Sequence, residues 1–246
     1  MPVIGGRAHN IEQIHEVGKF GYQYAEISLL EPDEVRGQID ELMKLREKYG
    51  LYYLAHYPNE GNPFDLNELG GRFIPKMRKL IDLTKKLGIP KGTIHFWIDK
   101  RWAPAQMISA KIALLSDLVS YAMDKDVVIC IENLTERYDS FTAAFDAIPD
   151  LKMTMDIGHG ELLSSRNTSF GFAEHVFDRI EHVHVHDNNG GKGVQDDLHL
   201  ALGDGRVDYP AILSILKKKD YNSTITMEVK PADMPRTKKN VENFIF

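Results

Sequence analysis

The fold class is indicated most directly by one stretch of the sequence, which reads Ile180-Glu181-His182-Val183-His184-Val185-His186-Asp187. Alternate side chains of a β-strand share a face, so the valines of this stretch occupy one face and the three histidines the other. In a closed parallel barrel, one face of each strand points to the interior and the other to the surrounding helices. We therefore expect the valines to pack under helices, and His184 and His186 to approach the mouth of a barrel.

The rest of the chain alternates short apolar, β-branched runs with longer segments whose apolar residues recur at helical spacing. This alternation is typical of repeated βα units around a parallel sheet. The predicted strands cover residues 3–5, 24–29, 52–57, 92–97, 127–132, 152–157, 180–186 and 224–229. A parallel barrel closes with eight strands, so we predict a (β/α)₈ TIM barrel that forms a single domain over residues 1–246.

The helical segments carry the expected start and stop signals. Residues 32–49 and 75–87 each place apolar side chains on one stripe. Prolines stand at predicted helix starts and glycines just past predicted helix ends, at Pro32, Pro75, Pro104, Gly50 and Gly88. The weakest unit is residues 161–178, for which we predict a broken helix with a loop.

Composition narrows the class of protein. With 43% apolar and 27% charged residues, the chain is expected to be globular. The single cysteine, Cys130, lies in an apolar run and indicates core packing in a reducing compartment. The sequence shows neither a secretory signal nor an apolar run of about eighteen residues, so we expect a cytoplasmic protein without membrane contact. A net charge of -6 without a dense basic run argues against a nucleic-acid partner.

Ionisable residues gather at or near the C-terminal ends of the predicted strands. They are Glu26, His56, His95, Glu132, Asp156, His184 and Glu228. These strand ends converge around one axis, and burying so many ionisable groups would cost several kcal/mol each or force their protonation. A shared cation removes that cost.

Two further clusters add donors of the same kind, Asp156-Ile157-Gly158-His159 and Asp197-Leu198-His199. Imidazole and carboxylate donors suit Zn²⁺, Mn²⁺ or Fe²⁺, and the absence of cysteine from the set excludes a structural thiolate site. Four other histidines receive no functional role, namely His9, His15, His175 and His182.

Five motifs follow one another along the chain, namely Ile131-Glu132-Asn133, Asp156-Ile157-Gly158-His159, His184-Val185-His186-Asp187, the segment from Asp197 and His199 to Gly203 and Gly205, and Met227-Glu228. In this order they resemble the xylose-isomerase-like barrel superfamily, which includes sugar isomerases and epimerases and the endonuclease IV repair nucleases. The resemblance covers nearly the whole chain.

The resemblance implies two ligand sets. The epimerase type would bind one metal through Glu132, Asp156, His184 and Glu228, with His159 near the substrate. The endonuclease IV type would bind three zinc ions through nine residues. These are His56, His95, Glu132, Asp156, His159, His184, Asp197, His199 and Glu228. We therefore expect one to three divalent ions per chain.

We favour a sugar or sugar-phosphate isomerase or epimerase acting through a metal-stabilised enediolate. The Glu26 strand and the Met227-Glu228-Val229-Lys230-Pro231 segment resemble that branch, and the chain is short and acidic for the nuclease branch. Glu132 and Glu228 would be ligands that also act as acid and base. The alternatives are an endonuclease IV-like zinc phosphodiesterase and a non-catalytic metal- or sugar-binding barrel.

Four residues are predicted to contact a sugar-like substrate, namely Glu26, Trp97, His186 and Lys230. Lys230 or Arg7 would meet a phosphate if the substrate carries one. The glycine-rich segment 188–195 is interpreted either as a loop that closes over the ligand or as an idle flexible loop. The oligomeric state stays open.

Overall fold

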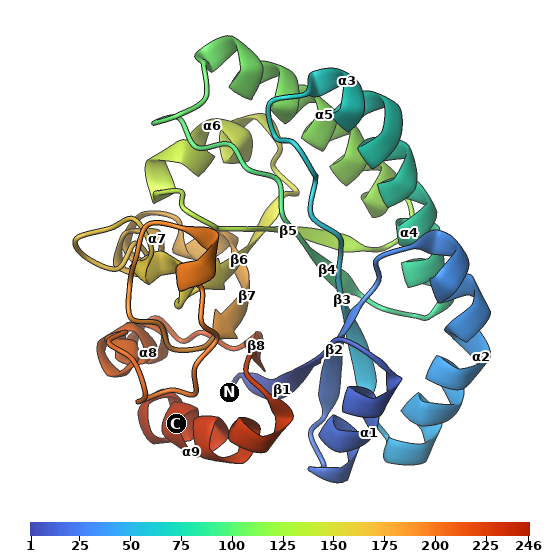
Figure 1. Ribbon diagram of the computed structural model, residues 1–246, viewed down its shortest axis with the longest axis vertical. Helices are drawn as coiled ribbons and strands as arrows, with labels where there is room; N and C mark the ends of the chain where they lie inside the picture. The colour runs from blue at the N-terminus through green and yellow to red at the C-terminus, as the bar shows by residue number, and fades with distance from the viewer.

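The computed structural model describes residues 1–246, apart from the side chain of Val194. Parallel strands close into a barrel in chain order and form the central ring of Figure 1. They are β1 (Val3–Ala8), β2 (Tyr24–Ser28), β3 (Tyr52–His56), β4 (Lys91–Ile94), β5 (Val128–Glu132), β6 (Lys152–Asp156), β7 (Ile180–Val185) and β8 (Thr224–Met227). The predicted TIM barrel is confirmed, although β1 continues past its predicted end and β4 stops before its predicted end.

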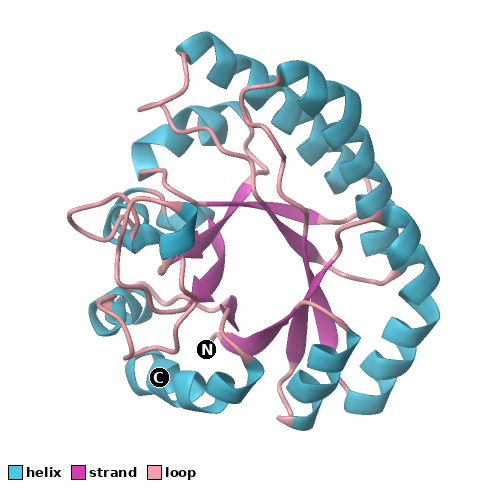
Figure 2. Ribbon diagram, in the orientation of Figure 1, coloured by secondary structure: helices cyan, strands magenta, loops and turns pink.

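Helices surround this ring on the outside (Figure 2). They are α1 (Ile11–Lys19), α2 (Pro32–Tyr49), α3 (Leu66–Glu68), α4 (Ile74–Lys86), α5 (Ala105–Met123), α6 (Tyr138–Ala147), α7 (Ser169–His175), α8 (Tyr209–Lys218) and α9 (Met234–Ile245). Pro32 opens α2, and Gly50 closes it at φ 62°, a conformation that glycine adopts without steric cost. Among the described residues, no helix is both long and apolar enough to cross a bilayer.

The sixth βα unit is broken, as the sequence predicts. Its helix α7 has only seven residues, and 3₁₀ turns at His159–Glu161 and Phe177–Arg179 flank it. Outside this unit the chain also forms the π turn Leu69–Phe73 and the 3₁₀ turns Val194–Asp196 and Pro231–Asp233. Because α7 is short, the chain between β6 and α7 stays at the mouth of the barrel, where His159 lies.

The two faces of β7 carry different kinds of side chain, as the alternation of residues along the strand predicts. Val183 and Val185 join the hydrophobic core between strands and helices, whereas His182, His184 and His186 are buried on the barrel side. This confirms the expectation from the sequence and shows that the inner face of the strand carries the polar groups.

The barrel interior below the mouth is itself polar. The hydroxyl of Tyr24 lies 3.0 Å from Thr226 Oγ1, and Thr93 Oγ1 lies 2.9 Å from Thr154 Oγ1. Tyr24 fits because Gly5 has no side chain, since a Cβ there would lie 2.6 Å from the tyrosine ring. TIM-barrel interiors are usually filled by branched apolar side chains. Here paired hydroxyl groups support the residues above them, which is the arrangement that a buried polar layer requires.

Candidate metal centre

The ends of four strands bring together what we call the central group, made of Glu132, Asp156, His184 and Glu228. One candidate ligand atom from each lies within 4.8 Å of all the others, and the four residues are buried. The imidazole Nδ1 of His184 lies 2.9 Å from Glu132 Oε1, 3.4 Å from Glu228 Oε2 and 3.7 Å from Asp156 Oδ2. His184 therefore presents one nitrogen to all three carboxylates.

A second set, the His95 group, consists of His56, His95 and Glu132 and shares its glutamate with the central group. His95 Nε2 lies 2.6 Å from Glu132 Oε2, and His56 Nε2 lies 3.5 Å from the same oxygen. The two oxygens of Glu132 thus face different groups, so this carboxylate lies between two candidate metal positions.

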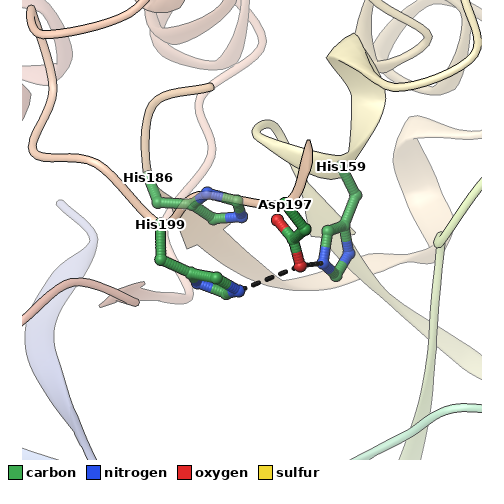
Figure 3. Close-up of side chains that lie close together, drawn as sticks. All are labelled: His159, His186, Asp197 and His199. Carbon is green, nitrogen blue, oxygen red and sulfur yellow. Dashed lines mark hydrogen bonds and ion pairs between the residues drawn. The ribbon is translucent and has the colours of Figure 1, made fainter. Parts of the chain in front are cut away.

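A third set, the His199 group, consists of His159, His186, Asp197 and His199. Figure 3 shows the Asp197 carboxylate between the rings of His159 and His199, whose Nε2 atoms lie 3.1 and 3.0 Å from Asp197 Oδ2. The His186 ring stacks on that of His199 with centroids 4.1 Å apart. Its Nε2 lies 3.0 Å from Asp156 Oδ1, so His186 connects this group to the central group.

Four histidines outside the central group are oriented as metal ligands are, whereas the buried Nδ1 of His186 has no hydrogen-bond partner among the described residues. A ligating imidazole usually donates its second N–H to a carbonyl or carboxylate, which fixes the tautomer and the ring orientation. The second nitrogens of His56 and His159 meet the carbonyls of Tyr57 and Asn133. That of His95 meets the side chain of Asn59, and that of His199 meets the carbonyl of Glu228. The donor set therefore fits a divalent cation on the evidence of its own hydrogen bonds.

The second nitrogen of His184 is held from below by a carboxylate. Its Nε2 lies 2.9 Å from Glu26 Oε2 and 3.1 Å from Glu26 Oε1, and both side chains are fully buried. The Nε2 of His182 also contacts Glu26, at 3.0 Å. Glu26 therefore fixes the orientation of the one imidazole in the central group.

The carboxylates and imidazoles of the centre shift one another's pKa values. Burial alone would raise the pKa of Glu132, but the nearby imidazoles of His184 and His95 outweigh it and hold this pKa well below its usual value. Burial would lower the pKa of His184, yet the carboxylates of Glu26 and Glu132 raise it well above its usual value. A protonated His184 would thus offset part of the carboxylate charge. A divalent cation would take over that role and displace the protons.

A buried aspartate holds the loop that carries Asp197 and His199. Asp187 Oδ1 accepts hydrogen bonds from the backbone N–H groups of residues 188 and 207, and its Oδ2 accepts one from residue 203. His199 adopts a left-handed backbone conformation with φ 46°. Such strain in a non-glycine residue persists only where the surroundings impose it. The loop is therefore built to place His199 against Asp197.

Two cavities open at the mouth on either side of the donors. What we call the apolar lobe has a volume of about 470 Å³, and its apolar lining comes from Phe64, Trp97, Leu134, Leu162 and Leu163. The polar lobe has a volume of about 480 Å³ and is lined by Arg7, His9, Ser28, Glu31 and Asn59, together with donor residues. His95, His159 and Asp197 line both lobes, so the candidate metal centre lies between them.

The residues predicted to contact substrate occupy different positions. Trp97 lines the apolar lobe. Glu26 and His186 are fully buried and contact candidate metal donors, and their contact with a substrate stays a prediction. Lys230 is exposed beyond the end of β8, whereas Arg7 lines the polar lobe and lies 3.2 Å from Glu228 Oε1. Of the two predicted phosphate contacts, Arg7 is the one placed in a cavity.

Several residues of the centre had no role in the sequence-based prediction. Asn59 holds His95 at 2.5 Å, and the side chain of Asn133 bonds the backbone of Asp156 in both directions. Asn133 follows Glu132 directly, so its place in the Ile131-Glu132-Asn133 motif was the available signal. Asn59 follows a predicted strand end without any pattern that distinguishes it from an ordinary loop residue.

Comparison with known proteins identifies the family of the chain. Residues 14–244 match the family described as xylose isomerase-like TIM barrel. The uncharacterized protein MJ1614 of Methanocaldococcus jannaschii is 31% identical over 207 residues, covering 79% of this chain and 77% of that protein. The uncharacterized protein MJ1311 of the same organism is 27% identical over 210 residues, covering 78% of this chain and 69% of that protein.

Solved structures share the fold at lower identity. A D-tagatose 3-epimerase-like protein superposes with a TM-score of 0.80 at 24% identity, covering 99% of this chain and 97% of that one. A D-allulose 3-epimerase from Methylomonas sp. in complex with D-allulose superposes with a TM-score of 0.74 at 19% identity, covering 99% and 93%. With the family match extending over nearly its whole length, the chain belongs to the xylose isomerase-like TIM-barrel family.

Proposed function

We propose that the chain is a divalent-metal-dependent isomerase or epimerase of a sugar-like substrate. The observation that carries this proposal is the central group, in which three carboxylates and one imidazole meet beside two open cavities. Mixed carboxylate and imidazole donors suit Mn²⁺, Zn²⁺ or Fe²⁺. The polar lobe beside them offers hydrogen-bonding groups for the hydroxyls of a sugar.

The two glutamates are arranged for proton transfer. Each directs one oxygen toward His184 and the other away from it. The outer oxygen of Glu132 faces His95, and that of Glu228 faces Arg7. A carboxylate whose two oxygens face different groups can hold a cation with one oxygen and exchange a proton at the other. We propose Glu132 and Glu228 as the acid and base on the two sides of the reacting carbon.

Isomerisation and epimerisation both require removal of a proton from a carbon next to a carbonyl. A bound divalent ion would polarise that carbonyl and lower the cost of the negative charge that develops on its oxygen. Asp156 and His184 would complete the ligand set. The 3-epimerases among the solved structures of this fold support a ketose or related hydroxycarbonyl compound as the substrate class.

The test replaces each glutamate by its amide. Glu132→Gln and Glu228→Gln should lower turnover of ketoses by at least about a hundredfold, the smaller contribution expected of a general acid or base, while the protein stays folded. Glu181→Gln makes the same change at the other end of the barrel, where Glu181 pairs with Lys91, and should keep activity. Full activity in both active-site variants would rule out the assignment.

A second candidate is phosphodiester hydrolysis at a multinuclear zinc centre, as in the endonuclease IV branch. The observation that favours it is that all nine residues of that branch's pattern gather into three adjoining groups. Closely spaced metals can activate water and hold the leaving oxygen. Three tightly bound zinc ions per chain with cleavage of abasic DNA would support this function. One ion per chain with ketose turnover would exclude it.

A further inference from the structure

The apolar lobe has polar side chains on its wall, among them Asn59, Thr135 and Lys192, but most of its wall is apolar. The apolar part comes from four different loops, with Phe64 after β3, Trp97 after β4, Leu134 after β5, and Leu162 and Leu163 after β6. A sugar hydroxyl placed against such side chains would lose its hydrogen bonds to water without replacement, which costs free energy. The polar lobe on the other side of the donors already offers partners for hydroxyls.

The apolar lobe is also preformed. The indole N–H of Trp97 donates to Thr135 Oγ1 at 3.1 Å, and this hydrogen bond fixes the orientation of the ring. Its backbone N–H donates to Glu60 Oε1 at 2.7 Å, and Glu60 is itself paired with Lys111 at 2.8 Å. Both partners of that ion pair are buried. The position of Trp97 is therefore fixed before any ligand arrives.

Phe64 completes the lobe next to Trp97, with ring centroids 5.3 Å apart and ring planes at 59°. Phe64 is 49% exposed and lines the edge of the cavity. An aromatic or alkyl group that entered the lobe would cover this ring and gain the free energy of apolar burial. The volume of about 470 Å³ lies within the range of pockets that hold drug-sized ligands.

We propose that the substrate carries an apolar group, aromatic or branched alkyl, on the end of its sugar-like part away from the reacting carbons, and that this group occupies the apolar lobe. The inference rests on the proposed function, because it assumes that the sugar-like part lies at the metal centre. It narrows the substrate class from free monosaccharides to sugars with an apolar substituent.

The experiment compares D-fructose with 6-O-benzyl-D-fructose on the Mn²⁺-loaded protein, measuring binding by calorimetry and epimerisation by product analysis. The benzyl ketose should bind about ten to a hundred times more tightly, the gain expected from burying one phenyl-sized group. Phe64→Ala and Leu134→Ala should each remove most of that gain. Phe20→Ala is the matched control, because Phe20 is also partly exposed, at 40%, but follows α1 far from the lobe.

The outcomes separate this inference from the proposed function. If the benzyl ketose has no advantage over D-fructose, including the case in which neither binds, the inference is overturned. Equal loss in Phe20→Ala overturns it as well. The benzyl ketose could bind tightly, with an affinity that depends on Phe64 and Leu134, while neither ketose is turned over. That result supports the inference about the apolar lobe and refutes the proposed reaction.

Discussion

Glu26→Gln tests how the barrel interior controls the metal centre. The substitution keeps the shape of the side chain but removes the charge that His184 Nε2 contacts at 2.9 Å. An amide also offers one acceptor oxygen instead of two to His182 and His184. Loss of such a support for a ligating histidine typically weakens metal binding ten- to a hundredfold. We therefore expect a loss of about 1.4 to 2.8 kcal/mol in the free energy of Mn²⁺ binding.

The assay is calorimetric titration of metal-free protein with Mn²⁺ at a fixed neutral pH, with circular dichroism as the check that the variant is folded. The matched control is Glu181→Gln, which neutralises another glutamate of the barrel where it pairs with Lys91 rather than with a candidate ligand. Its Mn²⁺ affinity should stay within a factor of two or so of the unmodified protein, as for other changes remote from a site. Unchanged affinity in folded Glu26→Gln protein would refute the reasoning.

Further predictions concern protons, packing and the supporting loop. Burial alone would lower the pKa of His199, but the hydrogen bond to its aspartate partner raises it to about 9. Because a ligand must be deprotonated, the affinity of the His199 group for a divalent ion should fall as the pH drops below about 9, and calorimetry in buffers of different ionisation enthalpy should detect proton release. Gly158→Ala should destabilise the protein by about 1–3 kcal/mol in denaturant unfolding, because its Cβ would lie 2.1–2.4 Å from the His186 ring. Gly37→Ala, where nothing lies within 4 Å, should instead stabilise helix α2 by about 0.5–1 kcal/mol, and the reverse order would contradict this. Asp187→Ala should expose residues 188–207 to limited proteolysis, and an unchanged cleavage pattern would show that the carboxylate does not hold the loop.

The sequence was sufficient to predict the barrel and the donors because both follow from strand periodicity. Alternation assigns His184 and Glu228 to the inner face, and closure of a parallel barrel brings the strand ends to one rim. Neither step needs information about distances. Their place at one rim was therefore predictable from residue types and spacing, whereas the four-residue ligand set was implied by the family resemblance.

The depth at which each side chain lies inside the barrel was not predictable, because it depends on the stagger between strands. In the observed register Ser28 pairs with His56 and Glu26 pairs with Leu54. Ser28 thus reaches the rim, and Glu26 lies one layer below it, where it contacts His184. A sequence gives the order of strands but not their shear.

The apolar lobe was not predictable either, since its walls come from loops of unrelated sequence. Of the apolar residues on its wall, Trp97 was the one predicted to contact a substrate. Phe64 and Leu134 lie in segments without regular periodicity, and only the folded chain shows that they face the same space. Loop conformation depends on contacts such as the Glu60–Lys111 pair, which joins residues far apart in the chain.

Anomalous X-ray diffraction from crystals grown with Mn²⁺ tests the central claim most directly. We predict an anomalous peak among Glu132, Asp156, His184 and Glu228, and its disappearance in crystals of Asp156→Asn protein. Occupation of the His95 and His199 groups as well would point to the multinuclear alternative. If the four side chains bind no ion at saturating Mn²⁺, or if the peak lies elsewhere in the molecule, the account of this barrel as a metal-dependent enzyme is contradicted.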